Sequence, residues 1–325
     1  MASDYSIWIG ENSLSKLNIS SYSKVAILVD ENTKKDCLHK LPKIDNSILI
    51  EIQSGEEKKN ITTCNFIWEQ LTKNNFDRNS LLINLGGGVI GDMGGFCAST
   101  YKRGIDFIQI PTTLLAMVDA SVGGKLGVDF NGLKNQIGIF NYPNSVIINP
   151  EFLSTLPENE LKSGFAEVVK HTLIADKNLW NKIISTSFNE LIWEEIIETS
   201  IQIKNKIVES DPFEKGERKK LNFGHTFGHA IESYYLEKGT PILHGEAIAL
   251  GMMLESDLSD LTVIEKETIN IFLYNFFQIP ELPPKHEIID LMKGDKKNKD
   301  GKINFSLLNG IGNCSIDNLF LADDL

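Results

Sequence analysis

Three of the six histidines lie close together in the chain and suggest a metal site. His225 and His229 are four residues apart, and His244 follows in His-Gly-Glu. Residues four apart share one face of a helix, and a divalent ion such as zinc accepts imidazole and carboxylate ligands while keeping one position open for substrate. Glu167 supplies a carboxylate upstream. The alternative is a group of core or capping histidines, and spacing alone does not decide whether His225, His229 or both would bind a metal.

A glycine-rich turn after a short apolar run predicts a nucleotide-phosphate site. The strand expected over Leu81–Leu85 leads into Gly-Gly-Gly-Val-Ile-Gly-Asp92 and then into a helix that reaches Thr100. Backbone amides at the start of a helix can hold a pyrophosphate, but tight turns need glycine for other reasons, so the motif alone is weak. Asp30 ends an earlier strand and could bind ribose hydroxyls. We therefore expect a nucleotide bound across several strand ends.

Composition narrows the possible functions. The chain has 325 residues and 42% hydrophobic content, which is enough for two domains with cores of their own. Its net charge of −12 argues against nucleic acid or an anionic membrane as a partner. The four cysteines show no CxxC or disulfide-framework spacing, and neither a secretory signal nor a membrane-spanning stretch is evident. These features predict a cytoplasmic protein.

The sequence pattern changes near residue 150. Before it, β-rich runs alternate with helical stretches such as Ile61–Asn74, which is typical of a parallel α/β sheet. After it, long amphipathic segments predict a helical domain. We expect a Rossmann-like nucleotide-binding α/β domain over residues 1–150 and an all-helical metal- and substrate-binding domain over residues 151–325. The expected strands are Ser6–Ile9, Lys24–Val29, Ser47–Ile52, Leu81–Leu85, Asp106–Pro111 and Ser145–Ile148, and the expected later helices are Glu158–Ala175, Trp193–Ser210, Asn222–Glu237, His244–Leu261 and Glu265–Phe277.

Ordered motifs extend over nearly the whole chain. They are Gly86–Asp92, Tyr101–Gly104, Pro111–Asp119, Ser121–Lys125, Lys134-Asn135, Ala166–Lys170, Asn222–His229 and His244–Glu246. In type and order these motifs resemble those of the 3-dehydroquinate synthase family of sugar-phosphate cyclases. The resemblance implies the dehydroquinate-synthase-like fold, with a parallel nucleotide-binding sheet followed by a helical domain.

The resemblance also implies a reaction. Members of the family are NAD- and divalent-metal-dependent carbon–oxygen lyases of the shikimate pathway that convert the seven-carbon phosphate DAHP to 3-dehydroquinate and phosphate. A substrate hydroxyl is transiently oxidised by NAD, phosphate is eliminated, the carbonyl is reduced again, and the ring closes by an intramolecular aldol reaction. The metal is zinc, with cobalt as a possible substitute. The resemblance implies that Glu167, His225 and His244 bind the metal, whereas His229 transfers protons.

The remaining roles follow from the same resemblance. DAHP carries a carboxylate and a phosphate, so an acidic protein needs a locally basic site to hold it. The implied substrate-binding residues are Arg103, Lys125, Lys134, Lys204, Arg218, Asn222 and Lys297, and the implied catalytic residues besides His229 are Glu214, Lys170, Asp119 and Asn135. The implied NAD contacts are Asp30, Glu56, Lys59, Gly87, Gly88, Val89, Asp92, Thr112, Thr113 and Thr155. A homodimer is expected, in which Arg103 reaches the substrate phosphate of the neighbouring subunit.

Three other functions are compatible with parts of this sequence pattern. A related cyclase would act on a sugar phosphate without a carboxylate, a polyol dehydrogenase of the same architecture would release NADH, and an NAD-binding regulator would perform no chemistry. The basic residues argue against the first, and the presence of Glu167, His225, His229 and His244 argues against the third. The second differs in the fate of the cofactor, which a synthase recycles.

Overall fold

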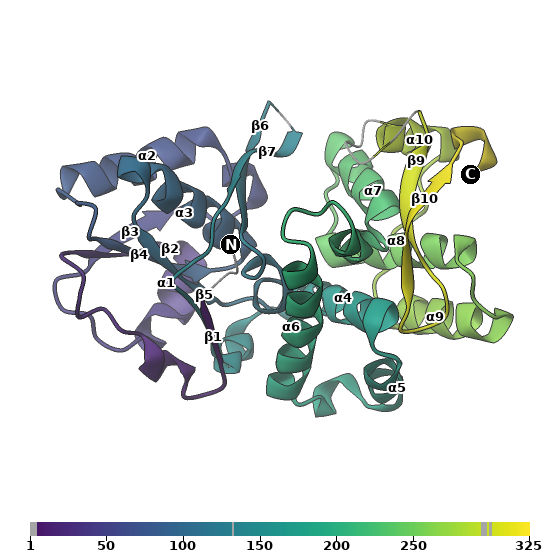
Figure 1. The fold of residues 1–325 in the computed structure, drawn as a ribbon, viewed down its shortest axis with the longest axis horizontal. Coiled ribbons are helices and arrows are strands. Elements are labelled where there is room, and N and C mark those ends of the chain that lie inside the picture. The colour runs from purple at the N-terminus through teal and green to yellow at the C-terminus, as the bar shows by residue number, and fades with distance from the viewer. Residues whose placement is uncertain (1–4, 132, 294–297, 299–300) are drawn as a thin grey trace. The chain divides into compact units, whose positions relative to one another are not determined.

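The computed structural model describes residues 5–131, 133–293, 298 and 301–325. The chain divides into two compact units, Met1–Pro157 and Glu158–Leu325 (Figure 1). The division follows the 3₁₀ helix Pro150–Thr155 (η6), whereas the sequence pattern changes near residue 150. Among the described residues, no helix combines the length and the apolar character needed to cross a bilayer.

The first unit is built on a six-stranded parallel sheet with the order β1-β8-β5-β4-β2-β3 (Figure 1). Residues of β4 are buried along the whole strand, and those of β2 along nearly all of it. Strands covered on both faces show continuous apolar runs instead of alternation, as these two do. The parallel sheet predicted from the sequence is confirmed. Its strands are β1 (Ser6–Ile9), β2 (Val25–Asp30), β3 (Ile48–Ile52), β4 (Leu81–Gly86), β5 (Asp106–Pro111) and β8 (Ser145–Ile148).

The direction of winding reverses between β2 and β4. From β2 the chain passes through α1 (Glu31–Asp36) to β3 on one side, then returns through α2 (Ile61–Lys73) to β4 on the other side of β2. From β4 it continues through α3 (Gly88–Thr100) to β5. In open parallel sheets, ligands bind at the carboxyl ends of the strands beside such a reversal. The reversal therefore marks the ends of β2 and β4 as the expected nucleotide site.

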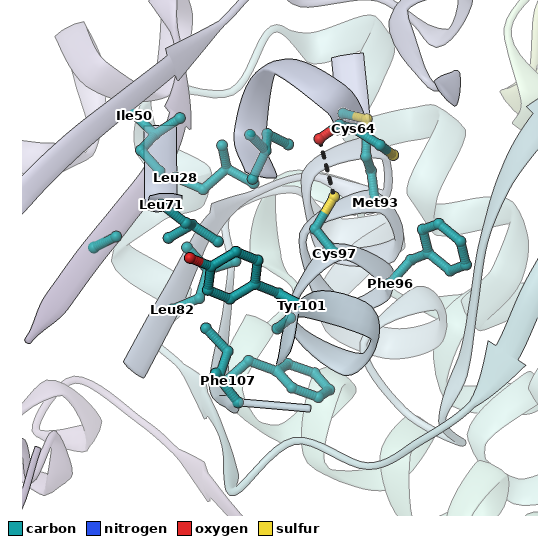
Figure 2. Packing of buried hydrophobic residues seen from close by; sticks show 14 of the residues in the cluster. Leu28, Ile50, Cys64, Leu71, Leu82, Met93, Phe96, Cys97, Tyr101 and Phe107 are labelled. Atoms are coloured by element: carbon teal, nitrogen blue, oxygen red, sulfur yellow. Dashed lines mark hydrogen bonds between the residues drawn. The ribbon is translucent and has the colours of Figure 1, made fainter. Parts of the chain in front are cut away.

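One apolar core joins the sheet to α2 and α3. Trp68 of α2 donates from Nε1 to the carbonyl oxygen of Cys97 at 3.1 Å, and the Cys97 thiol points to the carbonyl oxygen of Cys64 at 4.0 Å. These contacts fix α3 against α2, and thereby the glycine turn at the start of α3. Figure 2 shows Leu28, Ile50, Leu82 and Phe107 of the sheet gathered with Cys64 and Leu71 of α2 and with Met93, Phe96 and Cys97 of α3.

A hairpin that we did not predict follows the glycine-rich segment of the first unit. It consists of β6 (Lys125–Phe130) and β7 (Leu133–Phe140), which pair antiparallel and extend away from the sheet (Figure 1). Most residues of β7 are exposed, so its sequence shows no alternation of apolar and polar residues. Gly127 lies opposite Gly138, where an added Cβ would lie 2.6 Å from the carbonyl oxygen of Leu126. Glycine is required there by the close approach of the two strands.

The second unit is helical for most of its length, but the prediction of an all-helical domain is corrected by a short hairpin. Strand β9 (Ile303–Leu308) is buried throughout and pairs antiparallel with β10 (Cys314–Phe320). A short, fully buried strand lacks the period-two signal, which explains why it was not predicted. The helices are α4 (Glu158–Ala175), α5 (Lys177–Ser185), α6 (Trp193–Ser210), α7 (His225–Glu237), α8 (His244–Leu258), α9 (Val263–Phe276) and α10 (Lys285–Lys293).

Several predicted helix boundaries were wrong. The helix expected over Glu265–Phe277 spans Val263–Phe276, and two other boundaries differ by three residues each. The helix expected from Asn222 begins instead at His225, because Gly224 has a φ of 79° and cannot be part of a right-handed helix. The preceding residues form a 3₁₀ helix, Glu217–Asn222 (η8). The next helix ends at Leu258, because Ser259 is extended and its hydroxyl accepts a hydrogen bond from the backbone N–H of Leu308 in β9 at 2.9 Å.

Candidate functional site

Three potential metal ligands converge within the second unit, each from a different helix. Glu167 lies in α4, while His225 and His244 are the first residues of α7 and α8. Oε1 of Glu167 is 3.4 Å from Nε2 of His225 and 3.6 Å from Nε2 of His244. One donor atom from each residue lies within 4.8 Å of the other two. The structure thus brings together the three residues that the family resemblance assigns to the metal.

Two glycines of α8 permit this convergence. A Cβ on Gly245 would lie 2.2 Å from the carbonyl oxygen of Ser163 in α4, and one on Gly251 would lie 2.0 Å from the carbonyl oxygen of Gly224, just before α7. Both obstructing atoms belong to the backbone, so a rotamer change cannot relieve either clash. The helices that carry the ligands are therefore held at a separation that only glycine allows.

Substitution of Gly251 should test this packing. Gly251→Ala should lower the free energy of unfolding by about 1–3 kcal/mol, because α7 and α8 must move apart to admit the methyl group. Zinc affinity should fall as well, since His225 moves with α7. Chemical denaturation and zinc titration measure the two effects. Gly88→Ala is the control, because its Cβ would meet only the Ala120 Cβ at an ordinary 3.5 Å. Wild-type stability in Gly251→Ala would contradict the packing argument.

Each histidine of the triad has its Nδ1 atom beside an oxygen. Nδ1 of His225 is 3.1 Å from the carbonyl oxygen of Phe223, which requires the N–H to be on Nδ1 and leaves the Nε2 lone pair available. Nδ1 of His244 is 3.5 Å from Oε2 of Glu232 in α7. Metal-binding histidines typically have such a partner on the second ring nitrogen, which orients the ring. We had not identified Glu232 from the sequence, although it lies seven residues after His225 and hence on nearly the same helix face.

The charges at the triad favour a bound cation. Burial alone would raise the pKa of Glu167, but the positive charge of Lys170 and the contact with His225 hold it well below the usual range. Burial and the Lys170 charge lower the pKa of His225 against the opposing effect of Glu167. An ionised carboxylate and a neutral imidazole are the forms that bind metal. Burial would also lower the pKa of His244, yet Glu167 and Glu232 raise it to about 10, so the metal-free imidazole carries a proton that a bound cation would replace.

The residues of the triad fit a zinc- or cobalt-type ion. Glu167 is 1% exposed, and its Oε1 atom is buried without a hydrogen-bond partner in the described part of the chain. Its Oε2 atom pairs with Nζ of Lys170. A buried carboxylate oxygen without a hydrogen bond is costly unless something else compensates its charge. Two imidazoles and one carboxylate are a donor set that catalytic zinc sites use, with one position left for substrate.

His229 lies beside the triad without belonging to it. Its ring centre is 5.1 Å from that of His225 and 6.2 Å from that of His244. Among the described residues, the sets whose donor atoms lie close enough together to hold one ion include His225 and His244 but not His229. This placement suits a group that acts on a molecule bound near the metal, and it favours the family assignment over the one in which both helix histidines bind metal.

Several predicted substrate and proton-transfer residues lie in and around the segment before α7. Asn222 donates from Nδ2 to Oε1 of Glu214 at 2.8 Å. Arg218 is 2% exposed and donates from Nη1 to the carbonyl oxygen of Pro212 at 2.7 Å. Glu214 has a φ of 57°, which costs energy for a residue with a side chain and is often found at functional sites. Lys170 and Lys204 are buried, whereas Lys297 lies outside the described residues.

Asp211 organises this segment and was missed by the sequence analysis. Its carboxylate accepts backbone hydrogen bonds from Lys215 at 3.0 Å, Gly216 at 2.6 Å and Arg218 at 3.1 Å. Burial would raise the pKa of Asp211, but these three N–H groups lower it below the ordinary value of 3.8. An Asp-x-x-x-x-Gly spacing is too common to have identified it.

The lowered pKa of Asp211 predicts a pH-dependent stability. Because the folded state favours the carboxylate, the stabilisation is fully present above the unfolded pKa of 3.8 and is lost as the pH falls through the lower folded pKa. Asp211→Asn should therefore be less stable than wild type at neutral pH, and the difference should narrow in acid. Urea denaturation at several pH values measures it. An equal loss of stability at all pH values would show that the charge of Asp211 is unimportant.

The predicted NAD residues all follow the carboxyl ends of strands in the first unit. Because these ends meet at one edge of a parallel sheet, residues far apart in sequence share that edge. Asp30 ends β2, Glu56 and Lys59 follow β3, Gly87, Gly88, Val89 and Asp92 follow β4, Thr112 and Thr113 follow β5, and Thr155 follows β8. Gly87 packs against Thr113, where an added Cβ would lie 3.1 Å from Cγ2 of the threonine.

The buried side chain of Lys59 connects several of the residues at this edge. Lys59 is 4% exposed, and its Nζ atom lies 2.6 Å from Oδ2 of Asp92 and donates to Oδ1 of Asn135 at 2.8 Å. Burial would lower the pKa of Lys59, but the charges of Asp92, Glu56 and Asp129 raise it. Asn135, predicted to be catalytic, has a φ of 50° and donates its backbone N–H to Asp129 at 2.7 Å. Lys59 thus links α3 to the β6–β7 hairpin.

The other predicted residues of the first unit have varied surroundings. Asp30 caps α1, since its Oδ1 atom accepts the backbone N–H of Thr33 at 2.7 Å. Asp119 lies in a π-helical turn, Ala116–Ala120, of a kind often found at functional sites. Lys102 and Arg103 have φ values of 51° and 71°, so two consecutive side chains sit in a strained turn. Lys125 and Lys134 are exposed.

Comparison with known proteins identifies the family of the chain. Two family models match the chain, 3-dehydroquinate synthase N-terminal over residues 49–163 and 3-dehydroquinate synthase C-terminal over residues 164–298. The 3-dehydroquinate synthase of Parabacteroides distasonis is 41% identical, covering 93% of this chain and 89% of that protein. The 3-dehydroquinate synthase of Campylobacter concisus is 42% identical, covering 100% of this chain and 95% of that protein.

A solved structure shows the same fold. It is a 2-deoxy-scyllo-inosose synthase in complex with carbaglucose-6-phosphate, NAD⁺ and Co²⁺, which superposes with a TM-score of 0.85 at 26% identity over 98% of this chain and 94% of that chain. The sequence resemblance and the predicted fold class are therefore confirmed. The chain belongs to the 3-dehydroquinate synthase family.

Proposed function

We propose that this protein converts DAHP to 3-dehydroquinate and phosphate, with NAD⁺ and a divalent ion as cofactors. The observation that carries the proposal is the convergence of Glu167, His225 and His244 in a chain of this family. When bound, a zinc or cobalt ion supplies Lewis-acid polarisation of a hydroxyl or carbonyl oxygen. Transient oxidation, phosphate elimination, re-reduction and aldol closure then require proton transfers and anion binding, which the chain's own side chains provide.

Residues around the triad are proposed to transfer protons during the reaction. The ring of His229 contacts that of His225, and we propose that His229 exchanges a proton with an oxygen or carbon atom of the substrate. Glu214, positioned by Asn222, is proposed to join this relay. Lys170 balances the charge of Glu167, so the buried carboxylate stays ionised. Asp119 and Asn135 are proposed to be catalytic by resemblance.

Anion binding is assigned to basic residues in each unit. In the second unit, the buried side chains of Lys204 and Arg218 are proposed to bind the anionic groups of the substrate, because a guanidinium or ammonium group with little exposure to water binds carboxylate and phosphate strongly. Lys125, Lys134 and Arg103 of the first unit, and Lys297, are proposed to contribute further positive charge. The residues at the carboxyl edge of the sheet are proposed to bind NAD⁺.

The substrate class can be tested by comparing two phosphates. Purified protein with NAD⁺ and zinc is supplied either with DAHP or with a hexose 6-phosphate that has no carboxylate, and phosphate release is followed. The proposal expects release from DAHP and little from the hexose phosphate. Arg218→Lys keeps the charge but loses the bidentate geometry, so it should weaken DAHP turnover. Faster release from the hexose phosphate would favour a cyclase of different specificity.

A homodimer with shared active sites is part of the proposal. Arg103, in its strained turn, is proposed to reach the substrate phosphate of the neighbouring subunit. Arg103→Ala and His225→Ala chains should each be inactive alone. After co-assembly they should recover about a quarter of wild-type activity, because half of randomly formed dimers are mixed and each rebuilds one of two sites. If mixed dimers form and remain inactive, Arg103 acts within its own chain.

The proposal also covers the role of each unit and the location of the protein in the cell. The first unit is proposed to bind the nucleotide, and the second the metal, with the boundary between residues 150 and 158. A cytoplasmic location is proposed because all four cysteines are buried free thiols, as expected in a reducing compartment. Labelling of the denatured protein with a thiol reagent, with and without prior reduction, should give the same four modified cysteines.

A further inference from the structure

Glu255 occupies an unusual place in the second unit. It lies in α8, is 0% exposed, and directs its carboxylate at the start of α7. Oε2 accepts the backbone N–H of Gly224 at 2.6 Å, and Oε1 accepts those of Thr226 at 3.0 Å and Phe227 at 3.2 Å. The first N–H groups of a helix have no partner within it, and Gly224 at the N-cap has no side chain to supply one. Glu255 serves as the cap from a different helix.

The three N–H groups that Glu255 binds surround a metal ligand. His225 lies between Gly224 and Thr226, so one carboxylate fixes the backbone on both sides of it. Its ring is held in addition by the carbonyl oxygen of Phe223. The carboxylate is also favoured electrostatically, since a helix N-terminus carries partial positive charge. The position of the His225 imidazole therefore depends on Glu255, although Glu255 contacts the backbone around His225 and not its ring.

Helix α8 connects Glu255 to a second ligand. His244 is the first residue of α8, and Gly251 brings that helix against the carbonyl oxygen of Gly224. One helix thus carries His244 at its start and, three turns later, the carboxylate that fixes the start of the helix with His225. This connection fixes the position of His225 relative to His244, in addition to the contacts that both make with Glu167.

We propose that Glu255 is a positioning residue of the metal centre, whose carboxylate caps α7 so that the Nε2 atoms of His225 and His244 face the same ion. The inference rests on the proposed metal site. A cap that contributes only to stability would affect unfolding and leave metal binding unchanged. A positioning residue changes metal affinity and the geometry of coordination at temperatures where the protein remains folded.

The test uses the full-length protein and Glu255→Gln. Glutamine keeps the size and one acceptor, but its NH₂ group faces a backbone N–H and cannot accept from it. Zinc affinity, measured by competition with a chromogenic chelator, should fall about 10–100-fold, the range for groups that orient metal ligands. With cobalt in place of zinc, the visible absorption bands should shift in position or intensity. Thermal unfolding of the metal-free protein should occur at a lower temperature.

A matched control distinguishes displacement of the metal ligands from a general loss of folding stability. Leu273→Ala removes a 0% exposed side chain of α9 in the same unit and should lower the unfolding temperature without altering zinc affinity or the cobalt spectrum. If Glu255→Gln does not fold, Glu255→Asp, which keeps the charge but is one methylene shorter, is measured in the same way. Wild-type affinity and spectrum in the folded variant would overturn the inference. Failure of the wild-type protein itself to bind zinc or cobalt would instead refute the metal site.

Discussion

Replacement of His229 by alanine should lower turnover by about 10²–10⁴-fold, the usual contribution of a positioned acid or base, while the protein keeps its metal. The reason is its place beside the triad, one helical turn after His225 and outside the compact donor group. Steady-state kinetics with DAHP and metal analysis after dialysis measure the two quantities.

The metal content decides between the two possible roles of His229. Glu167→Ala serves as the comparison, because removal of a proposed ligand should lose both metal and activity. If His229→Ala also lost the metal, both helix histidines would be ligands, as their spacing alone allows. If it kept both metal and full turnover, His229 would have no part in proton transfer.

Replacement of His225 or His244 by alanine should abolish metal binding and reduce turnover by at least about 10²–10³-fold, since a Lewis acid contributes several kcal/mol to stabilisation of developing charge. Each variant keeps only two of three donors and leaves the buried Glu167 carboxylate with less compensation. Chelation of the wild-type ion should have the same effect, and added zinc or cobalt should reverse it.

A histidine outside the site is the control for these variants. His286 lies exposed in α10, and His286→Ala should keep both metal and turnover. Full activity of the thoroughly metal-stripped wild-type protein would contradict the assignment of the triad. Metal retained in both His225→Ala and His244→Ala would place the ion elsewhere.

Periodicity and turn chemistry predicted much of the fold. The strands at Ser6–Ile9, Asp106–Pro111 and Ser145–Ile148 and the helices at Glu158–Ala175 and Trp193–Ser210 have the expected bounds. Each of these elements carries apolar residues in a run or at the spacing of its own period, which is the signal that a sequence shows most directly. The two hairpins escaped prediction because one is exposed on most of its second strand and the other is buried along its first.

The candidate site was harder to derive from spacing alone. His225 and His229 share a helix face, and what distinguishes them is that His225 is the first residue of α7 and lies beside Glu167 of α4. That contact depends on how α4, α7 and α8 pack. The choice of His225 as the ligand comes from the family motifs and stays a prediction.

Supporting residues were missed for the same reason. Asp211, Glu232 and Glu255 act on backbone N–H groups or on a second ring nitrogen, through contacts that tertiary packing creates. Glu255 is thirty-one positions from Gly224, and no local pattern connects an acidic residue late in one helix with the first turn of another. Such partners become visible only when each buried polar group is traced to its hydrogen bonds.

We expect this protein to use NAD⁺ transiently as it converts DAHP to 3-dehydroquinate with release of phosphate. The most direct measurement supplies DAHP, NAD⁺ and zinc to the purified protein and follows phosphate and NADH together over many turnovers. Phosphate and 3-dehydroquinate should accumulate in equal amounts until DAHP is consumed, while NADH never exceeds the enzyme concentration. NADH that accumulates in step with product, or the absence of phosphate release from the metal-loaded protein, would contradict the proposed reaction.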